Sequence, residues 1–288
     1  MASMRDIKRR KASIESTQQI TKAMKLVSTV KLQKAKTRAE DSKPYFNKMY
    51  DTVQSILSRS GNIDHPYLRS NGSGKKAVIV VTSNRGLAGG YNSNVVKLVE
   101  SGNIAKEDAK IYGIGKKGIE SLARKGYEIV SDDSEIINEP LFSDAVEIGR
   151  KVLDAYLAGE VGEIYLAYTG FKNTVVHIPK LIKLLPVEVK EDLAEGKKEE
   201  GKEAPMNYEP EAEESLDLLI PKYMNSIIYG AFIESVASEN GARMQAMDAA
   251  TSNAEDMIAT LSVAFNRARQ GAITQELTEI ISGAEALN

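Results

Sequence analysis

The chain has 288 residues, no cysteine and only two histidines, His65 and His177. The lack of cysteine excludes disulfides and thiolate metal sites, and two histidines are too few for a histidine-based metal centre. No apolar run approaches the ~20 residues of a membrane span, and the first residues lack a signal-peptide core. We therefore expect a cytoplasmic protein that binds no metal or cofactor of its own.

The net charge of −2 conceals two segments of opposite sign. Residues 1–48 hold thirteen Lys or Arg against four acids, whereas residues 191–217 hold eleven acids against three Lys. This separation predicts different partners at different places along the chain.

Residues 3–58 are predicted to form a long helix, with Ser3 as N-cap and a possible kink or step at Pro44. The helix is expected to bury one apolar stripe, made of Ile7, Ile14, Ile20, Met24, Val27 and Val30. The other faces are rich in Lys and Arg, which favours an acidic partner. Nucleic acid is an alternative partner, but this helix has no interleaved aromatic residues and no recognised reading motif.

The central residues read as alternating strands and helices. Strands are predicted over 77–82, 110–113, 127–130 and 163–168, with a fifth inside 174–185, and helices over 92–100, 117–125 and 143–158. The continuous apolar run at 77–82 is typical of a strand buried on both faces. We therefore expect a small α/β (Rossmann-like) domain with a mostly parallel sheet.

Two glycine-rich turns in this domain could be mistaken for phosphate sites. Residues 113–118 match GxGxxG, but they follow the second predicted strand, and the acids about twenty residues later lie in a polar run. Residues 83–92 (SNRGLAGGYN) lack the spacing and the lysine of a Walker motif. A nucleotide-dependent enzyme is therefore an alternative, and structural turns are the better interpretation.

The last helix is predicted from about Glu211 to Leu287, a rod of roughly 100 Å. Its seam alternates by three and four residues through Met247, Ala250, Ala254, Met257, Leu261, Ala264, Ala268 and Gly271. Apolar residues continue beyond it at Ile273, Leu277 and Ile280. Because the seam is thin, we expect an antiparallel pairing with the first helix and a partner that surrounds the pair.

Four segments follow from these patterns: an N-terminal helix of a coiled coil (1–60), a central α/β domain (75–190), an acidic exposed loop (191–208) and a C-terminal helix of the coiled coil (209–288). No Ser, His, Lys or carboxylate grouping is arranged for acid–base or nucleophilic catalysis. The chain is therefore predicted to be non-catalytic.

Several ordered motifs resemble the gamma subunit of the rotary (F-type) ATP synthases of bacteria. They are residues 14–30 (IESTQQITKAMKLVSTV), 84–92 (NRGLAGGYN), 208–210 (YEP), 238–254 (SENGARMQAMDAATSNA) and 265–280 (FNRARQGAITQELTEI). The resemblance covers essentially the whole chain. The acidic loop matches no family motif, and its role stays open.

The resemblance implies a rotor shaft inside a hexamer of alpha and beta subunits, with the α/β domain meeting the epsilon subunit and the membrane-embedded c-subunit ring. Catalysis would lie in the beta subunits, and the chain would contact the membrane only through the ring, at its cytoplasmic face. Rotation would couple ion translocation to ATP synthesis or hydrolysis. The resemblance leaves open whether the ion is a proton or sodium.

The resemblance also assigns contact residues. Those expected to meet the beta subunits are Met24, Lys25, Arg243, Arg269, Gln270, Thr274 and Glu276. Tyr208 and Glu209 would lie near the ring and epsilon.

Overall fold

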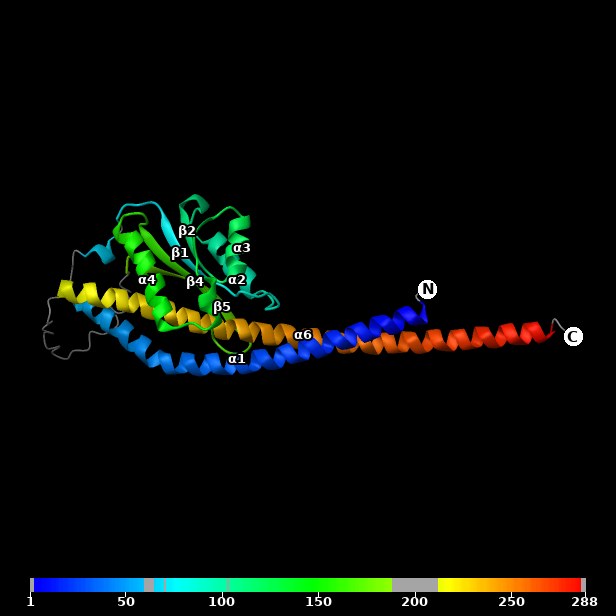
Figure 1. The fold of residues 1–288 in the computed structure, drawn as a ribbon. Helices are drawn as coiled ribbons and strands as arrows, with labels where there is room; N and C mark the ends of the chain where they lie inside the picture. Colours follow the sequence, from blue (N-terminus) through cyan, green and yellow to red (C-terminus); the bar gives the residue numbers. More distant parts are fainter. Residues whose placement is uncertain (1–2, 60–64, 70, 103, 188–211, 286–288) are drawn as a thin grey trace. The chain divides into compact units, whose positions relative to one another are not determined.

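The structure, a computed structural model, describes residues 3–59, 65–69, 71–102, 104–187 and 212–285. The chain divides into two compact units: Met1–Thr29 with Arg243–Asn288, here the helical unit, and Val30–Ala242, here the sheet unit. Each of the two long helices contributes one part to each unit (Figure 1). The predicted acidic loop, Tyr208 and Glu209 lie outside the described residues.

The two long helices are α1 (Met4–Arg59) and α6 (Ala212–Glu285). Ser3 caps α1 as predicted, because its hydroxyl accepts a hydrogen bond from the Asp6 backbone N–H at 3.3 Å. The same hydroxyl donates to the Asp6 carboxylate at 2.9 Å, and Asp6 lies where the helix dipole favours an anion. Pro44 lies inside α1 without ending it, and Pro221 lies inside α6.

The sheet unit contains five strands in the order β3-β2-β1-β4-β5. The strands are Lys76–Val81 (β1), Ala109–Ile114 (β2), Glu128–Asp132 (β3), Glu163–Phe171 (β4) and His177–Leu185 (β5). β1 pairs in parallel with β2 and β4, and β2 pairs in parallel with β3. Only β5 is antiparallel, against β4, so the prediction of a mostly parallel sheet is confirmed.

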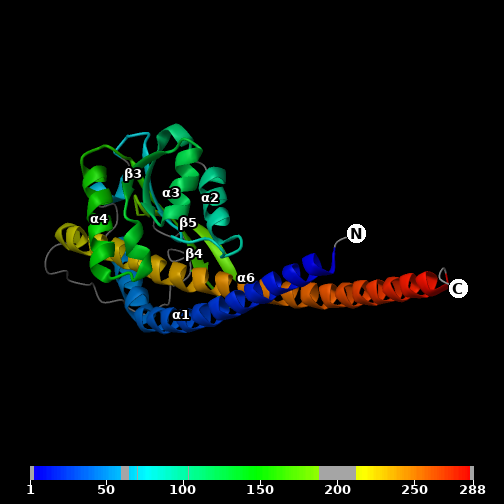
Figure 2. The ribbon, with the colours of Figure 1, turned by 45° about the vertical axis from the view of Figure 1, so that its right-hand side comes forward.

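Helices cover both faces of this sheet (Figures 1 and 2). They are α2 (Tyr91–Ser101), α3 (Lys116–Arg124) and α4 (Phe142–Leu157). Short 3-10 helices that were not among the predicted elements lie in connections to and from the strands, at Pro66–Leu68 (η1), Lys106–Asp108 (η2) and Ser134–Asn138 (η3). Val78 of β1 belongs to one apolar cluster with Leu122 of α3. The next residue, Ile79, belongs to the other cluster with Ile148 of α4 and Ile220 of α6. β1 is therefore buried on both faces, as its continuous apolar sequence predicts.

Candidate partner interface

Three polar contacts join the two helices of the helical unit. They are Gln18–Glu255, Thr21–Thr251 and Lys25–Asp248. As the position on α1 advances by three and then four residues, the position on α6 recedes by four and then three. The helices therefore run antiparallel, which confirms the predicted coiled coil.

The central contact is a buried pair of hydroxyl groups. The Oγ1 atoms of Thr21 and Thr251 lie 2.8 Å apart, and the two residues are 8% and 9% exposed. Each hydroxyl also has a backbone acceptor in its own helix, the carbonyl of Gln18 at 3.0 Å or that of Met247 at 2.7 Å. Both polar groups are therefore satisfied inside the seam, which keeps their burial from being costly.

The covered positions of α1 recur every seven residues and include polar side chains. Ile7 and Ile14 are half-buried, and Thr21 and Ser28 are buried. The predicted apolar stripe is wrong at three positions, which are 58%, 58% and 70% exposed: Ile20, Val27 and Val30. The reason is that the residues facing the partner helix are fixed by the seven-residue repeat, so Thr21 and Ser28 occupy the covered positions although they are polar.

The seam of α6 agrees with the prediction at six of its eight positions. These six are buried or half-buried: Met247, Ala250, Ala254, Leu261, Ala264 and Ala268. The prediction is wrong at Met257, which is 50% exposed while the next residue, Ile258, is half-buried. It is also wrong at Gly271, which is exposed.

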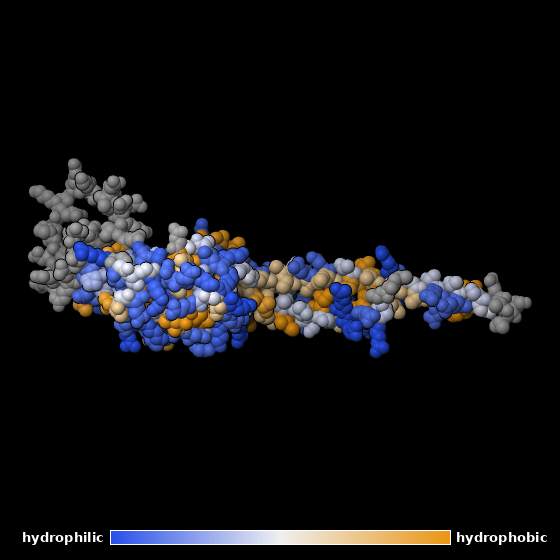
Figure 3. Space-filling model, turned by 90° about the horizontal axis from the view of Figure 1, so that it is seen from above, coloured by the Kyte–Doolittle hydropathy of each residue, from blue (hydrophilic) through white to orange (hydrophobic). Residues whose placement is uncertain are grey.

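Large apolar side chains consequently lie on the outer surface of the paired helices. Five of them are 50–64% exposed: Ile20, Leu26, Val27, Met257 and Val263. Figure 3 shows hydrophobic and hydrophilic side chains side by side along this surface. Apolar residues gathered on a slender helix pair are typical of a surface that another protein covers.

The end of α6 is exposed on all sides. Counted from the Lys25–Asp248 contact, Met4 at the start of α1 lies opposite residue 269, so α1 does not reach the residues beyond. Every residue from 271 to 284 is exposed, and a Cβ added at Gly271 would meet nothing within 4 Å. An apolar stripe nevertheless continues there, with 51–63% exposure: Ile273, Leu277, Ile280 and Ile281.

The structure places most of the predicted contact residues on these two surfaces. Four lie exposed at the end of α6: Arg269, Gln270, Thr274 and Glu276. The Thr274 hydroxyl donates to the Gln270 backbone carbonyl at 2.9 Å, which leaves the Gln270 side chain outside that contact. The other three are partly covered and lie nearer the sheet unit along the sequence: Met24, Lys25 and Arg243.

The Lys25–Asp248 ion pair is a surface contact. The two side chains are 40% and 62% exposed, so water screens their attraction. Such pairs contribute about 0–1 kcal/mol to stability. Lys25 is therefore held to Asp248 only weakly, and both charged side chains remain accessible to solvent.

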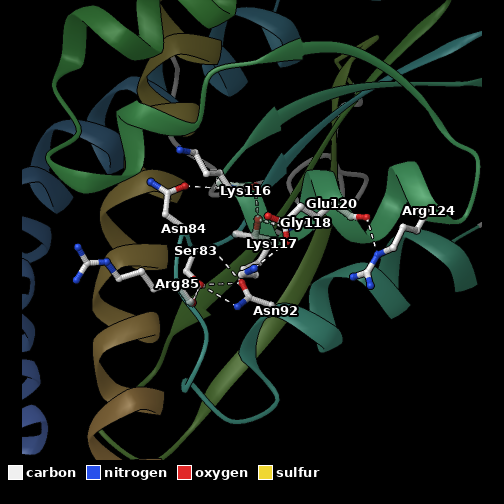
Figure 4. A network of polar contacts seen from close by, with 11 residues as sticks. Ser83, Asn84, Arg85, Asn92, Lys116, Lys117, Gly118, Glu120 and Arg124 are labelled. Carbon is white, nitrogen blue, oxygen red and sulfur yellow. Dashed lines mark hydrogen bonds and ion pairs between the residues drawn. The ribbon is translucent and has the colours of Figure 1, made fainter.

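In the GxGxxG turn, the first three backbone amides of α3 are not free to bind a phosphate. The first amides of α3 are taken by the segment that follows β1: Lys116 N–H donates to Asn84 Oδ1 at 3.0 Å, and Gly118 N–H donates to Thr82 Oγ1 at 2.9 Å. Between them, the Lys117 N–H donates to the Ser83 carbonyl at 3.0 Å (Figure 4). The glycines serve close packing, as the better interpretation predicted, and the dinucleotide alternative gains no support.

Charged side chains around this turn also pair with each other. Lys117 Nζ lies 2.7 Å from Glu120 Oε2 (Figure 4), and this hydrogen bond lowers the pKa of the exposed Glu120 carboxyl. Lys116 lies 3.7 Å from Glu135. The basic residues at the start of α3 are thus balanced by acids and form no site for an anion.

The loop between β1 and α2 is tightly braced. Ser83 and Asn92 exchange hydrogen bonds of 2.8–3.0 Å (Figure 4). Asn84 donates to the Ser134 carbonyl at 2.8 Å. Between these braces Leu87 has φ +63°, and it is the one non-glycine residue with positive φ in the described part of the chain. That conformation costs roughly 1–2 kcal/mol for a side chain with a Cβ. The sequence predicts a structural turn at residues 83–92 and indicates no role for Leu87.

Across the described residues, no helical segment combines the length and the apolar character that a bilayer crossing requires. Nor do they contain three His, Cys, Asp or Glu side chains grouped so that they could hold a metal ion.

Comparison with known proteins gives consistent matches along the whole chain. A family model described as ATP synthase matches residues 3–287. The chain is 67% identical to the ATP synthase gamma chain of Lachnoclostridium phytofermentans, with 100% of both chains covered. It is 43% identical to a sodium ion specific ATP synthase gamma chain of Acetobacterium woodii, with 99% of both covered.

A solved structure shares the fold. In the mitochondrial ATP synthase of Euglena gracilis, solved with its c-ring, one chain matches with a TM-score of 0.66 and 18% identity. The match covers 99% of this chain and 94% of that one.

Proposed function

This chain belongs to the ATP synthase gamma-chain family, and we propose that it is the central rotor shaft of an F-type ATP synthase. The observation that carries the proposal is the exposed end of α6, with its apolar stripe at Ile273, Leu277 and Ile280. A helix end with apolar residues on its surface and no covering helix requires a partner that encloses it. The bore of a ring of larger subunits has that shape.

The proposed mechanism is mechanical, and this chain is not catalytic. The ATP sites lie in the beta subunits, and the shaft presents a different side to each of them as it turns. Because α1 and α6 expose different side chains, the surface of the shaft is asymmetric around its axis. Rotation therefore changes the conformation of the three catalytic sites in turn and couples ion flow to ATP synthesis or hydrolysis.

The contacts with the beta subunits form two groups. At the end of α6, Arg269, Gln270, Thr274 and Glu276 offer exposed hydrogen-bonding groups, and the Arg269 guanidinium suits bidentate contact with a carboxylate. The second group is Met24, Lys25 and Arg243, in the part of the helical unit that adjoins the sheet unit in sequence. Basic residues of α1 would guide acidic loops of the beta subunits into register.

The opposite end of the shaft meets the membrane part. We assign the segment of the central α/β domain (75–190), with Tyr208 and Glu209 beyond it, to contact with epsilon and the c-subunit ring. The terminal segments 1–60 and 209–288 form the shaft, and the acidic loop 191–208 has no assigned role. The complex would lie peripherally on the cytoplasmic face of a bacterial cell membrane.

Native mass spectrometry of the complex captured by a tag on this chain tests the proposal. We expect one copy of the chain bound to three alpha and three beta subunits together with one small epsilon-like subunit. A monomer or homodimer, captured under conditions that keep other large assemblies of the same cell intact, would contradict it.

A further inference from the structure

Two hydrogen bonds attach the hairpin formed by β4 and β5 to α6 within the sheet unit. The Ser238 hydroxyl donates to the Thr169 carbonyl at 3.1 Å, in a buried position. The Phe171 backbone N–H donates to the Glu234 carboxylate at 3.3 Å. Because residues 234 and 238 are about one helical turn apart, they lie on the same face of α6.

A third contact on this face is made by the imidazole of His177, the first residue of β5. Its partner is Gly241, which follows Ser238 by three residues and so continues the same face. A Cβ added at Gly241 would lie 2.5 Å from His177 Nε2. The ring therefore occupies the space that a side chain at position 241 would take. The Phe171 ring lies nearby, with its centroid 6.1 Å from that of the imidazole.

His177 Nε2 is a polar atom in this close contact with the helix. The atom is buried and has no hydrogen-bond partner among the described residues, although the residue as a whole is half-buried. An imidazolium carries a charge and an N–H on each nitrogen, so it loses more than the neutral ring when water is excluded. Burial accordingly lowers the pKa of His177 below its ordinary value of 6.5. The contact therefore favours the neutral ring.

The elements that contact the hairpin also carry charged side chains. They are Lys172 in the turn of the hairpin, Lys180 on β5, and Glu234, Glu239 and Arg243 on α6. The Lys180 ammonium and the Glu234 carboxylate approach the same point at Gly170, so these opposite charges lie together. The pKa of His177 is lowered by burial, and no neighbouring carboxylate reverses that direction.

From these observations we propose that His177 and Gly241 form a pH-sensitive latch, closed while the imidazole is neutral and released when it takes up a proton. Release would separate the turn end of the β4–β5 hairpin from the last turn of α6 in the sheet unit, which ends at Ala242. In the proposed shaft, release would loosen the connection between the sheet and the helix as the pH falls. That consequence rests on the proposed function, whereas the latch itself does not.

The direction of the pH dependence follows from which state binds the proton more tightly. In the closed hairpin the pKa of His177 is lowered, whereas in the open hairpin the ring is in water and its pKa is about 6.5. The open state therefore binds more protons, and the stability that the latch contributes above this pH is lost as the pH falls below it. Because one proton is taken up, the open population can grow at most about 10-fold per pH unit.

Hydrogen exchange of the full-length chain, measured at about pH 7.5 and about pH 5.5, tests the latch without titrating ordinary carboxyl groups. The readout is the protection of residues 169–178, corrected for the intrinsic pH dependence of exchange. His177→Gln replaces the imidazole by an amide that does not titrate. His65→Gln is the matched control, because His65 is the other histidine of the chain and contacts Asp217 instead.

Gly241→Ala tests the latch from the side of the helix. The added Cβ would displace the imidazole at either pH, while alanine favours the helix itself. This variant keeps the proposal testable where His177→Gln disturbs the hairpin.

We expect residues 169–178 to lose protection at the lower pH in the unaltered chain and in His65→Gln. The loss should be absent in His177→Gln and in Gly241→Ala. A loss in His177→Gln as large as in the unaltered chain overturns the proposal, and so does equal protection of the unaltered chain at both pH values. Because the chain is measured alone, neither result changes the case for the shaft, and failure to capture a hexamer would leave the latch standing.

Discussion

Two stretches of α6 have opposite surroundings. In the sheet unit, every fourth residue is at most 1% exposed: Leu216, Ile220, Met224, Ile228 and Phe232. In the helical unit, every residue from 271 to 284 is exposed. The same helix therefore has one stretch whose apolar side chains are buried in the chain's own core and another stretch whose residues are all exposed.

The difference shows where the chain is self-sufficient. Burying one large apolar side chain contributes about 1.5–3 kcal/mol, so the first stretch stabilises the sheet unit without outside help. Ile273 and Leu277 are more than half exposed and contribute little until another protein covers them. Apolar burial within the chain therefore stabilises the sheet unit, whereas the apolar residues at the end of α6 can contribute substantially only in a complex.

The largest effect should come from Gly115→Ala in the sheet unit. The added Cβ would lie 2.0 Å from the Thr82 backbone carbonyl, and φ there is +107°. Neither the clash nor the strain can be relieved by turning a side chain, so we expect a loss of about 3 kcal/mol or more in unfolding free energy. Chemical denaturation of the isolated chain measures it.

Gly159→Ala is the matched control for this prediction. Gly159 also has positive φ, +76°, but a Cβ there would meet nothing within 4 Å. It should cost only the strain, about 1 kcal/mol. Equal losses for the two variants would show that close packing at the GxGxxG turn is not what requires Gly115.

The same contrast explains how far the sequence predicted the fold. Ile79 and Val80 lie in a run whose two faces are both apolar, so the buried strand and the parallel sheet follow directly. The turn at Gly115 was harder, because GxGxxG is compatible with both phosphate binding and close packing. Only the positions of Thr82, Ser83 and Asn84 relative to α3 distinguish them.

The interface was less predictable than the fold. Hydrophobic periodicity assumes that apolar residues face inward, and this assumption is wrong at Ile20 and Val27, which are exposed while Thr21 is buried. On a surface that a partner covers, apolar residues also face outward, so one sequence carries two overlapping patterns. The positive φ at Leu87 was not predicted, because such a conformation at a leucine has no sequence signal.

A smaller effect on stability, with a large effect on function, is expected for Arg269→Glu at the end of α6. Arg269 is exposed, so the isolated chain should stay folded with unchanged unfolding temperature. In the complex the reversed charge would face an acidic or carbonyl-lined partner. We expect coupled ATP turnover to fall roughly 10-fold.

Arg267→Glu is the matched variant for Arg269→Glu. It changes the net charge by the same amount but lies on another side of the helix. Arg267 is also exposed, and two residues of an α-helix separate it from Arg269 by more than half a turn. It should lower turnover less. Unchanged turnover in Arg269→Glu, with the complex intact, would remove Arg269 from the beta-subunit contacts.

The smallest effect is a gain, predicted for Gly271→Ala. Glycine inside an exposed helix costs about 1 kcal/mol relative to alanine, and here the added methyl would meet no atom of the chain. Hydrogen exchange of the isolated chain should become slower around residue 271 and stay unchanged in the sheet unit. A loss of protection there would mean that a contact within the chain requires the glycine. A gain in protection confined to this stretch would mean that only its own backbone hydrogen bonds stabilise it. Residues 216–232 of the same helix are stabilised in addition by packing in the sheet unit.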